Sequence, residues 1–453
     1  MVGRFALRRA GRRQRLETCV SSRQPRNRPA AAPLTRGAVF LLRGLFIVKR
    51  DHRQSAPPQD RQRILSERRN LKMARSAHAY VRGNTGKFYE WLAAGGRAHP
   101  QGPPVWICGD CHLGNLGPVA DADDNVQIQI RDLDQTVIGN PAHDLIRLGL
   151  SLATAARGSD LPGVTTARML EEMMVGYSDA LASKDSSDIA TGQRPDSVHL
   201  VMRKAVDRTW KHLARERIED LKPTIPLGRR FWPLSKHEKR DVRRLFRTEE
   251  VRRVATCLRS RDDDGDIELL DAAYWVKGCS SLGRLRIAAL LRVGKKKNKE
   301  SEFCLIDIKE AVKAAAPRSA ASGMPRDFAE RVVAGARHLT PSLGERMVSA
   351  SLAGKAVFIR ELLPQDLKLE IDQLTQEEAT KAARYLSMVV GKAHADQMDA
   401  ATWRIWRKEL IRNRSKNLEA PSWLWSSVVD LVTIHEAAYL DHCRKYAMKA
   451  AKP

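Results

Sequence analysis

The stretch Ile107–Gly117 has the sequence ICGDCHLGNLG, in which two patterns of reactive side chains overlap. Its two cysteines and its histidine have the C-x-x-C-H spacing that attaches c-type haem. Asp110 and Asn115 lie five residues apart in the same stretch. One short loop therefore offers a carboxylate and an amide oxygen as well as a haem-attachment pattern.

The composition is that of a globular protein with anionic partners. The chain has 453 residues, of which 43% are hydrophobic. This length allows about two or three domains and a sizeable core. The formal net charge is +26. A charge of this size favours anionic partners such as nucleic acid, an acidic membrane surface or phosphorylated small molecules.

A basic segment begins the chain. Met1–Arg50 is rich in arginine and contains a single acidic residue, Glu17. This composition is typical of a disordered arm or a transit peptide, and an initiation codon placed too far upstream would explain it equally. The apolar run Ala38–Val48 is interrupted by Arg43 and is too short to span a bilayer. It also lies too far from the N-terminus for a secretory signal, so we expect a cytoplasmic protein without a transmembrane segment.

Cysteine usage argues against haem attachment. The seven cysteines are odd in number and lack the spacing of a small disulfide-rich domain, which indicates reduced thiols. Attachment of c-type haem normally follows export, and we find no export signal ahead of the motif. We therefore interpret Cys108 and Cys111 as incidental, and Asp110 with Asn115 as the pair that carries chemistry.

Patterns of apolar residues predict an α+β chain with two lobes. Alternating apolar and polar residues predict a strand in Asn125–Asp134, and a capping box formed by Thr375 and Glu378 predicts the start of a helix. The predicted helices are 61–94, 165–182, most of 197–255, 328–338, 375–397 and 401–453, and the other predicted strands lie in 272–293, 302–311 and 355–362. The predicted parts are a basic arm (1–60), a mainly helical lobe with the catalytic and metal-binding loops (61–260), a strand-rich nucleotide-binding lobe (261–365) and a helical part that packs on the helical lobe (366–453).

Three polar residues near Ile107–Gly117 fit a site for phosphoryl transfer. Such a site needs a carboxylate that takes the proton of the acceptor hydroxyl and oxygen ligands that hold Mg²⁺ on the phosphates. Asp110 can be the base, and Asn115 can reach the metal from the other end of the loop. Asp132, at the end of the predicted strand, supplies a second metal ligand. Asp134 is an alternative to Asp132, which we prefer on spacing.

The segment from residue 106 to residue 148 resembles the aminoglycoside phosphotransferase and choline kinase group of the protein-kinase-like superfamily. CGDCHLGN is similar to the H-G-D-x-H-x-x-N loop of this group, and GNPAHDL is similar to its G-D-P-x-x-D-L turn. Between them a strand ends in Asp132, as in the I-D-[FW] strand of the group. The resemblance implies that His112 supports the loop, that Asp132 binds the metal and that Asp144 braces the loop. Cys108 stands where the pattern has its first histidine, so the geometry of this loop departs from that of the group.

A second set of motifs resembles the nucleotide-binding half of a kinase. VKGCSSLGRLRI resembles G-x-G-x-x-G-x-V with a serine in place of the middle glycine, and such a turn lets backbone N–H groups approach phosphate. The residues assigned to this turn are Gly278, Ser280, Ser281 and Gly283. Lys309 in CLIDIKEA resembles the V-A-I-K lysine that pairs the nucleotide phosphates. An inward lysine in an apolar strand requires a partner, and the resemblance assigns Glu330 of the following helix to that role.

The nucleotide-binding motifs lie in an unusual order. VFIRELL resembles the hinge strand that offers backbone groups to adenine, with Glu361 and Leu363 at its end. In an ordinary kinase these motifs precede the catalytic loop, whereas here they follow it by about 170 residues. The resemblance therefore implies a circularly permuted kinase-like fold, in which the helix 377–397 packs where the chain normally enters the catalytic loop.

The order of the motifs also resembles a bacterial family called domain of unknown function 2252. The similar segments are KMARSAHAYVRGNTGKFYEWL, VWICGDCHLGNLG, IQIRDLDQTVIGNPAHDLIRL, LIDIKEA, RVVAGAR and AHADQ, in this order. The resemblance covers roughly residues 60–450. It implies that Arg82, in YVRGN, lies near the site.

We expect a cytoplasmic bacterial phosphotransferase that uses ATP and Mg²⁺ and acts on a small-molecule acceptor that the sequence does not specify. Asp110 and Lys309 are the predicted catalytic residues, and Asn115 and Asp132 the predicted metal ligands. Two alternatives remain open. The same site could transfer a nucleotidyl group, or the protein could bind a nucleotide or nucleic acid without turnover. Nucleic acid is permitted by the charge but not favoured, because no aromatic residues interleave with the basic strands.

Overall fold

The computed structural model describes residues 55–121, 125–182, 195–196, 198, 200–202, 224–256, 266–294, 302–318, 323–363, 375–412 and 420–447. These residues lie within one compact unit, Arg53–Pro453. The predicted basic arm and the middle of the predicted helical segment 197–255 fall mostly outside the described residues. The described part contains both helices and a six-stranded sheet, so the prediction of an α+β chain is confirmed.

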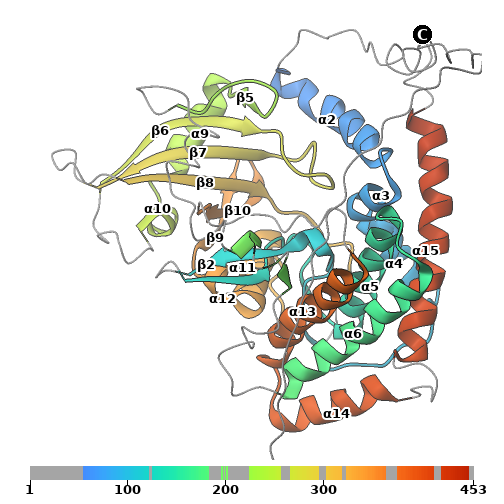
Figure 1. The fold of residues 1–453 in the computed structure, drawn as a ribbon. Coiled ribbons are helices and arrows are strands. Elements are labelled where there is room, and N and C mark those ends of the chain that lie inside the picture. The colour runs from blue at the N-terminus through green and yellow to red at the C-terminus, as the bar shows by residue number, and fades with distance from the viewer. Residues whose placement is uncertain are drawn as a thin grey trace, which may run out of the picture. The chain divides into compact units, whose positions relative to one another are not determined.

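The sheet is antiparallel throughout and has the strand order β5-β6-β7-β8-β10-β9 (Figure 1). A helix, α11, separates β8 from β9 along the chain, so that β10 rather than β9 pairs with β8. The elements of this part are β5 (Phe231–Pro233), α9 (Lys236–Leu245), α10 (Glu249–Thr256), β6 (Ile267–Trp275), β7 (Arg286–Val293), β8 (Glu302–Glu310), α11 (Phe328–Leu339), α12 (Pro341–Gly344), β9 (Met347–Leu352) and β10 (Lys355–Glu361).

The alternation of side chains along β8 gives the sheet one apolar face and one face on which charged side chains lie beside a smaller apolar cluster. Cys304, Ile306 and Ile308 point to a core that includes apolar residues of α9 and α10. Asp307 and Lys309 therefore point to the opposite face. The register places Lys309 beside Arg286 of β7 and Phe358 of β10. Lys309, which the pattern CLIDIKEA predicted to be inward, thus shares one face with Asp307 and with residues of both neighbouring strands.

The helical part has α5 at its centre, and α13 lies along α6 (Figure 1). Two glycines allow this close approach, since a Cβ on Gly176 would lie 2.0 Å from the carbonyl oxygen of Arg384 and a Cβ on Gly391 would lie 2.9 Å from Ala180 Cβ. The helices are α2 (Pro58–Met73), α3 (Ala77–Gly83), α4 (Thr85–Ala93), α5 (Pro141–Gly158), α6 (Gly163–Ala182), α13 (Gln376–Ala395), α14 (Ala400–Ile411) and α15 (Ser422–His442), followed by a π-helical turn, η4 (Cys443–Ala447).

Two small pairs of antiparallel strands position the loops that carry the predicted site residues. β1 (Val105–Ile107) pairs with β4 (Val137–Gly139), and β2 (Leu116–Ala120) pairs with β3 (Val126–Ile130). The chain runs from β1 through a 3₁₀ turn, η2 (Leu113–Asn115), into β2, and later from β3 back to β4. The loop after β1 and the loop after β3 therefore meet where the two strand pairs adjoin.

Several element boundaries differ from those predicted. The predicted helix 61–94 is three helices, because Ser76 and Asn84 cap new helices with their side chains. The predicted strand ends at Ile130, which leaves Asp132 and Asp134 in a loop. The two helices α9 and α10, assigned by the prediction to the helical lobe, pack on the six-stranded sheet. Among the described helices, none is long and apolar enough to cross a membrane.

Candidate functional site

The loop that follows β1 is held by Asp144, in the first turn of α5. The Asp144 carboxylate accepts hydrogen bonds from the backbone N–H groups of Cys108, over 2.7 Å, and Gly109, over 2.9 Å. Gly109 has a φ of +73°, and a Cβ there would lie 2.1 Å from the carbonyl oxygen of Gln135. Only glycine fits this turn. The turn and the two hydrogen bonds to Asp144 fix the backbone position from which the Asp110 side chain extends.

Asp110 is buried, and an arginine balances its charge. Arg147 Nη2 and Nε each lie 2.9 Å from Asp110 Oδ1. Burial raises the pKa of Asp110 above its ordinary value, and the charge of Arg147 opposes this rise. His112 Nε2 lies 3.9 Å from Asp110 Oδ2. Burial, followed by the charges of Arg82 and Arg147, lowers the pKa of His112 well below its ordinary value, so Asp110 lies beside a neutral imidazole.

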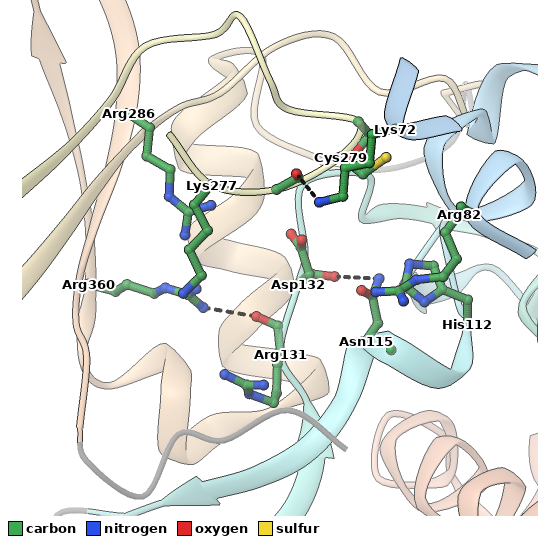
Figure 2. A pocket seen from close by; sticks show the side chains of 14 residues that line it. Lys72, Arg82, His112, Asn115, Arg131, Asp132, Lys277, Cys279, Arg286 and Arg360 are labelled. Carbon is green, nitrogen blue, oxygen red and sulfur yellow. Dashed lines mark hydrogen bonds between the residues drawn. The ribbon is translucent and has the colours of Figure 1, made fainter. Parts of the chain in front are cut away.

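Asn115 ends the same loop and is oriented by backbone carbonyl groups. Its Nδ2 donates to the carbonyl oxygens of Asp110, over 2.9 Å, and Asp132, over 3.4 Å (Figure 2). The backbone N–H of Arg131 donates to the carbonyl oxygen of Asn115 over 2.7 Å. Because its amide nitrogen is engaged by two carbonyl groups, Asn115 keeps Oδ1 for a ligand.

Lys309 connects the sheet to the loop after β3. Its Nζ lies 3.2 Å from Asp132 Oδ1 and 2.5 Å from Asp134 Oδ2. The side chain of Asp132 is 47% exposed and that of Asp134 is 12% exposed, so Asp132 is the more open carboxylate. Burial would raise the pKa of Asp132, but the charge of Lys309 and a hydrogen bond with Asp134 hold it well below its ordinary value. Burial and the charge of Asp132 raise the pKa of Asp134 to about 6. Asp132 is therefore ionised near neutral pH and offers an anionic oxygen to the cavity.

Two arginines of the sheet share one buried aspartate, Asp307. Arg286 Nε lies 2.8 Å from Asp307 Oδ1, and Arg286 Nη2 lies 2.5 Å from Oδ2. Arg360 Nη2 lies 3.3 Å from Oδ2, and its Nη1 donates to the carbonyl oxygen of Arg131 over 2.9 Å (Figure 2). Burial would raise the pKa of Asp307, but the two arginines hold it well below its ordinary value. The three side chains keep one net positive charge in a fixed place.

The glycine-containing turn between β6 and β7 completes this side of the site. Gly278 has a φ of +102° and Gly283 a φ of +96°, which favours glycine at both positions. A Cβ on Gly278 would lie 2.3 Å from Ser281 Oγ. Lys72 of α2 donates to the carbonyl oxygen of Gly278 over 2.8 Å (Figure 2). Ser281 is buried beneath the turn, whereas Ser280 faces the cavity described next.

A cavity of about 310 Å³ with a strongly positive lining lies beside these groups. Asn115 and Asp132 line it, whereas the predicted catalytic residues Asp110 and Lys309 do not. Six of its lining residues are cationic, and one, Asp132, is acidic. Figure 2 shows Asp132 with Arg286, Lys277 and Arg360 on one side and Lys72 and Arg82 on the other. The lining consists of Lys72, Ala79, Arg82, His112, Gly114, Asn115, Arg131, Asp132, Lys277, Gly278, Cys279, Ser280, Arg286 and Arg360. A cavity of this charge suits a ligand with several negative charges, such as phosphate groups.

A family model described as "Uncharacterized protein conserved in bacteria (DUF2252)" matches residues 61–445. The match covers most of the chain and every residue of the cavity lining. The chain belongs to this family. No curated protein matches the chain, and no solved structure matches it.

In this DUF2252 protein, Glu330 does not lie beside Lys309 as expected. Glu330 is exposed in the first turn of α11, and the described carboxylate partners of Lys309 are Asp132 and Asp134. The next residue, Arg331, is buried and donates to the carbonyl oxygens of Thr136, Asp134 and Val312. The rotation of α11 about its axis thus turns an arginine inward, toward backbone carbonyl groups that it can satisfy.

Glu361 and Leu363, predicted to lie near adenine, do not line the cavity of the DUF2252 chain. Glu361 is fully buried, and its carbonyl oxygen accepts a hydrogen bond from Arg346 Nη1 over 3.1 Å. Leu363 is buried in a small apolar cluster with Ala120 and Val126. The residues that follow, 364–374, lie outside the described residues.

Several cavity residues escaped the sequence analysis. Lys277, Arg286 and Arg360 lie in or next to apolar strands, and they belong to neither the glycine pattern nor the lysine pattern that predicted this half of the site. The sequence nevertheless indicated that cations lie here. Asp307 is two residues before Lys309 in the same strand, so both side chains point to one face, and a buried aspartate requires a cation. The identity of the cations depends on the register of β7 and β10 with β8, which no local pattern specifies.

The oxygen ligands fit a magnesium ion that is shared with a bound phosphate. Within the described ranges, no three His, Cys, Asp or Glu side chains are grouped as a metal site. Asp132 and Asn115 therefore form a two-ligand set of oxygen donors. Mg²⁺ commonly keeps several waters and is held by one or two carboxylates together with substrate phosphates. The donor set fits that mode and does not fit a closed all-protein metal cage.

Proposed function

We propose that this protein is an ATP- and Mg²⁺-dependent phosphotransferase with a circularly permuted kinase-like fold. The contact of Lys309 with Asp132 carries the proposal. Kinase-like sites require a lysine on the nucleotide phosphates and an aspartate on the metal that bridges those phosphates. Both side chains therefore have to reach one phosphate group, and a 3.2 Å separation satisfies this condition.

The arrangement of the sheet supports the kinase-like part of the proposal. The glycine-containing turn joins two neighbouring strands, β6 and β7, and Lys309 lies on the next strand, β8. A helix, α11, follows that strand. Protein kinases likewise place a Gly-rich loop over the phosphates, the lysine on the third strand and a helix beyond it. Here the described carboxylate partners of Lys309, Asp132 and Asp134, come from the loop after β3 rather than from that helix.

Contacts of α13 support the permutation. Gln397, just after α13, accepts a hydrogen bond from the Trp106 N–H over 2.8 Å and donates one to the Trp106 carbonyl oxygen over 3.1 Å. His394 Nε2 lies 3.3 Å from Asp144 Oδ2. The end of α13 therefore lies against the strand that leads into the Asp110 loop, where the chain of an unpermuted kinase would enter that loop.

Each residue has a distinct chemical task in the proposed reaction. The acceptor hydroxyl gives its proton to Asp110, and its oxygen forms a bond to the terminal phosphorus of ATP. The bond between that phosphorus and the bridging oxygen breaks, and ADP leaves with the bond's electron pair. Asn115 Oδ1 and Asp132 would hold Mg²⁺, which supplies charge neutralisation on the phosphates. Lys309 and the backbone of the Gly278–Gly283 turn orient the phosphates.

The proposal is tested by titrating ATP into the protein calorimetrically, with and without Mg²⁺. We expect Mg²⁺-dependent binding that Asp132→Asn weakens by at least about tenfold, because a ligand charge is lost. Asp160→Asn is a matched control, since Asp160 is exposed and its φ of 54° is tolerated by asparagine. Equal ATP binding with and without Mg²⁺, or in Asp132→Asn, would reject the site. Binding to DNA without ATP, with a steep dependence on salt, would favour the nucleic-acid alternative.

A further inference from the structure

We infer that the acceptor itself carries a phosphate group, which Arg82 of α3 and Lys72 of α2 bind across Asp132 from the arginines of the sheet. The inference rests on the proposed function, because it concerns the second substrate of the same site. It follows from where the cations of the cavity lie and from which of them already have partners.

Arg82 is a half-buried cation that lies directly over the catalytic loop. It lies in the last turn of α3, and its guanidinium covers Gly114, where a Cβ would lie 2.5 Å from Arg82 Nη2. Gly114 is next to Asn115 and lies between Asn115 and Asp110 along the loop. Arg82 is therefore placed beside the residues to which the acceptor hydroxyl has to come.

Arg82 differs from the other arginines near the cavity in its partners. Arg147 pairs with Asp110, and Arg286 and Arg360 share Asp307. Among the described residues, Arg82 has neither a hydrogen bond nor an ion pair. A guanidinium that is partly withdrawn from water gains most from an anion that accepts two of its N–H groups.

The nucleotide does not require these cations. In the proposed reaction, Lys309, the glycine-containing turn and a metal held by Asp132 would bind the phosphates of the nucleotide. These groups correspond to those that bind nucleotide phosphates in phosphoryl transfer. Figure 2 shows Arg82 and Lys72 across Asp132 from Arg286 and Arg360. Among the described residues, neither Arg82 nor Lys72 has an ion pair with an acidic side chain. Two such cations favour a phosphate, with about −1.5 to −2 charges and three acceptor oxygens, over a single carboxylate.

The inference is tested with inorganic phosphate as the probe. Phosphate is titrated calorimetrically into the protein saturated with Mg²⁺ and ADP. We expect one phosphate to bind. Arg82→Gln should lower the affinity for phosphate by at least about tenfold, because one charge-assisted bidentate contact is lost. The affinity for ADP should stay within about twofold of the wild-type value, since the nucleotide is held on the other side. Arg75→Gln is the matched control, because Arg75 is exposed and lies outside the cavity lining.

A second variant keeps the test decisive if Arg82→Gln does not fold. Gly114→Ala leaves Arg82 in the chain but displaces its guanidinium, and it should weaken phosphate in the same way. Competition between phosphate and ADP for one position, or unchanged phosphate affinity in both variants, would overturn the inference and leave the phosphotransferase proposal intact. If ADP does not bind at all, the proposed function fails. In that case phosphate binding to the protein alone, lost in Arg82→Gln, would still support the anion site.

Discussion

Lys309 Nζ lies 3.2 Å from Asp132 Oδ1, although the two residues are 177 positions apart in the chain. Asp134 shares the same ammonium group at 2.5 Å. The ion pairs join a strand of the six-stranded sheet to the loop after β3. Each half of the candidate site is therefore held in place by a charge from the other half.

Replacing the lysine should destabilise the fold as well as the site. In Lys309→Met, Asp134 stays buried without its cation, and we expect the free energy of unfolding at pH 8 to fall by about 3 kcal/mol. Urea denaturation measures this change. Lys355→Met removes an exposed lysine that pairs with Glu310 on the same sheet, and it should cost less than about 1 kcal/mol. Equal losses in the two variants would show that the Lys309 ion pairs do not hold the halves together.

The turn before Asp110 should accept no side chain. Gly109→Ala places a Cβ 2.1 Å from the Gln135 carbonyl oxygen at a φ of +73°, and we expect it to lower the free energy of unfolding by about 2 to 3 kcal/mol. Gly158→Ala, at the end of α5, meets no atom within 4 Å and should raise stability by about 0.5 kcal/mol. Thermal unfolding of both variants distinguishes local strain from a general effect of added methyl groups.

The sequence revealed the parts of the site that lie close together in the chain. Asp110, Asn115, Asp132 and Asp144 were found because the turn residues and the two short strand pairs impose their spacing. Lys309 was found because a charge in an apolar strand is conspicuous. Arg286 and Arg360 were missed because their place beside Asp307 depends on strand register, which long-range pairing determines. The rotation of α11, which exposes Glu330 and buries Arg331, depends likewise on tertiary packing.

A buried histidine should make the protein less stable in acid. His435 is 1% exposed, and burial followed by the charge of Arg147 lowers its pKa to about 4. The unfolded chain, with a histidine pKa of about 6.5, binds the proton first as the pH falls. This contribution to stability is therefore present above about pH 6.5 and is lost as the pH falls toward 4, by about 2 kcal/mol at pH 4.5.

Urea denaturation at pH 7.5 and pH 4.5 tests the histidine. His435→Gln should lose less stability than the wild type between these two pH values. His237→Gln, in which an exposed histidine is replaced, should behave as the wild type does. A wild-type acid dependence that survives in His435→Gln would assign the effect to other groups.

The double hydrogen bond between Gln397 and Trp106 should matter for both stability and turnover. Gln397→Ala leaves the Trp106 N–H without its side-chain acceptor, and we expect a loss of about 1 to 2 kcal/mol in the free energy of unfolding. Gln376→Ala, at an exposed position of the first turn of the same helix, is the control. If the two variants have equal stability, the end of α13 does not anchor the strand that enters the Asp110 loop.

The most direct test of the account is ³¹P NMR of the protein with ATP and Mg²⁺, with a filtered pool of bacterial small molecules as the source of the acceptor. We predict that the terminal phosphorus of ATP is transferred, so that ADP and a new phosphomonoester or inorganic phosphate appear. We further predict that Asp132→Asn slows this conversion by at least about a hundredfold, because a metal ligand is lost. Formation of AMP and pyrophosphate, or conversion at an equal rate in Asp132→Asn, would contradict the account.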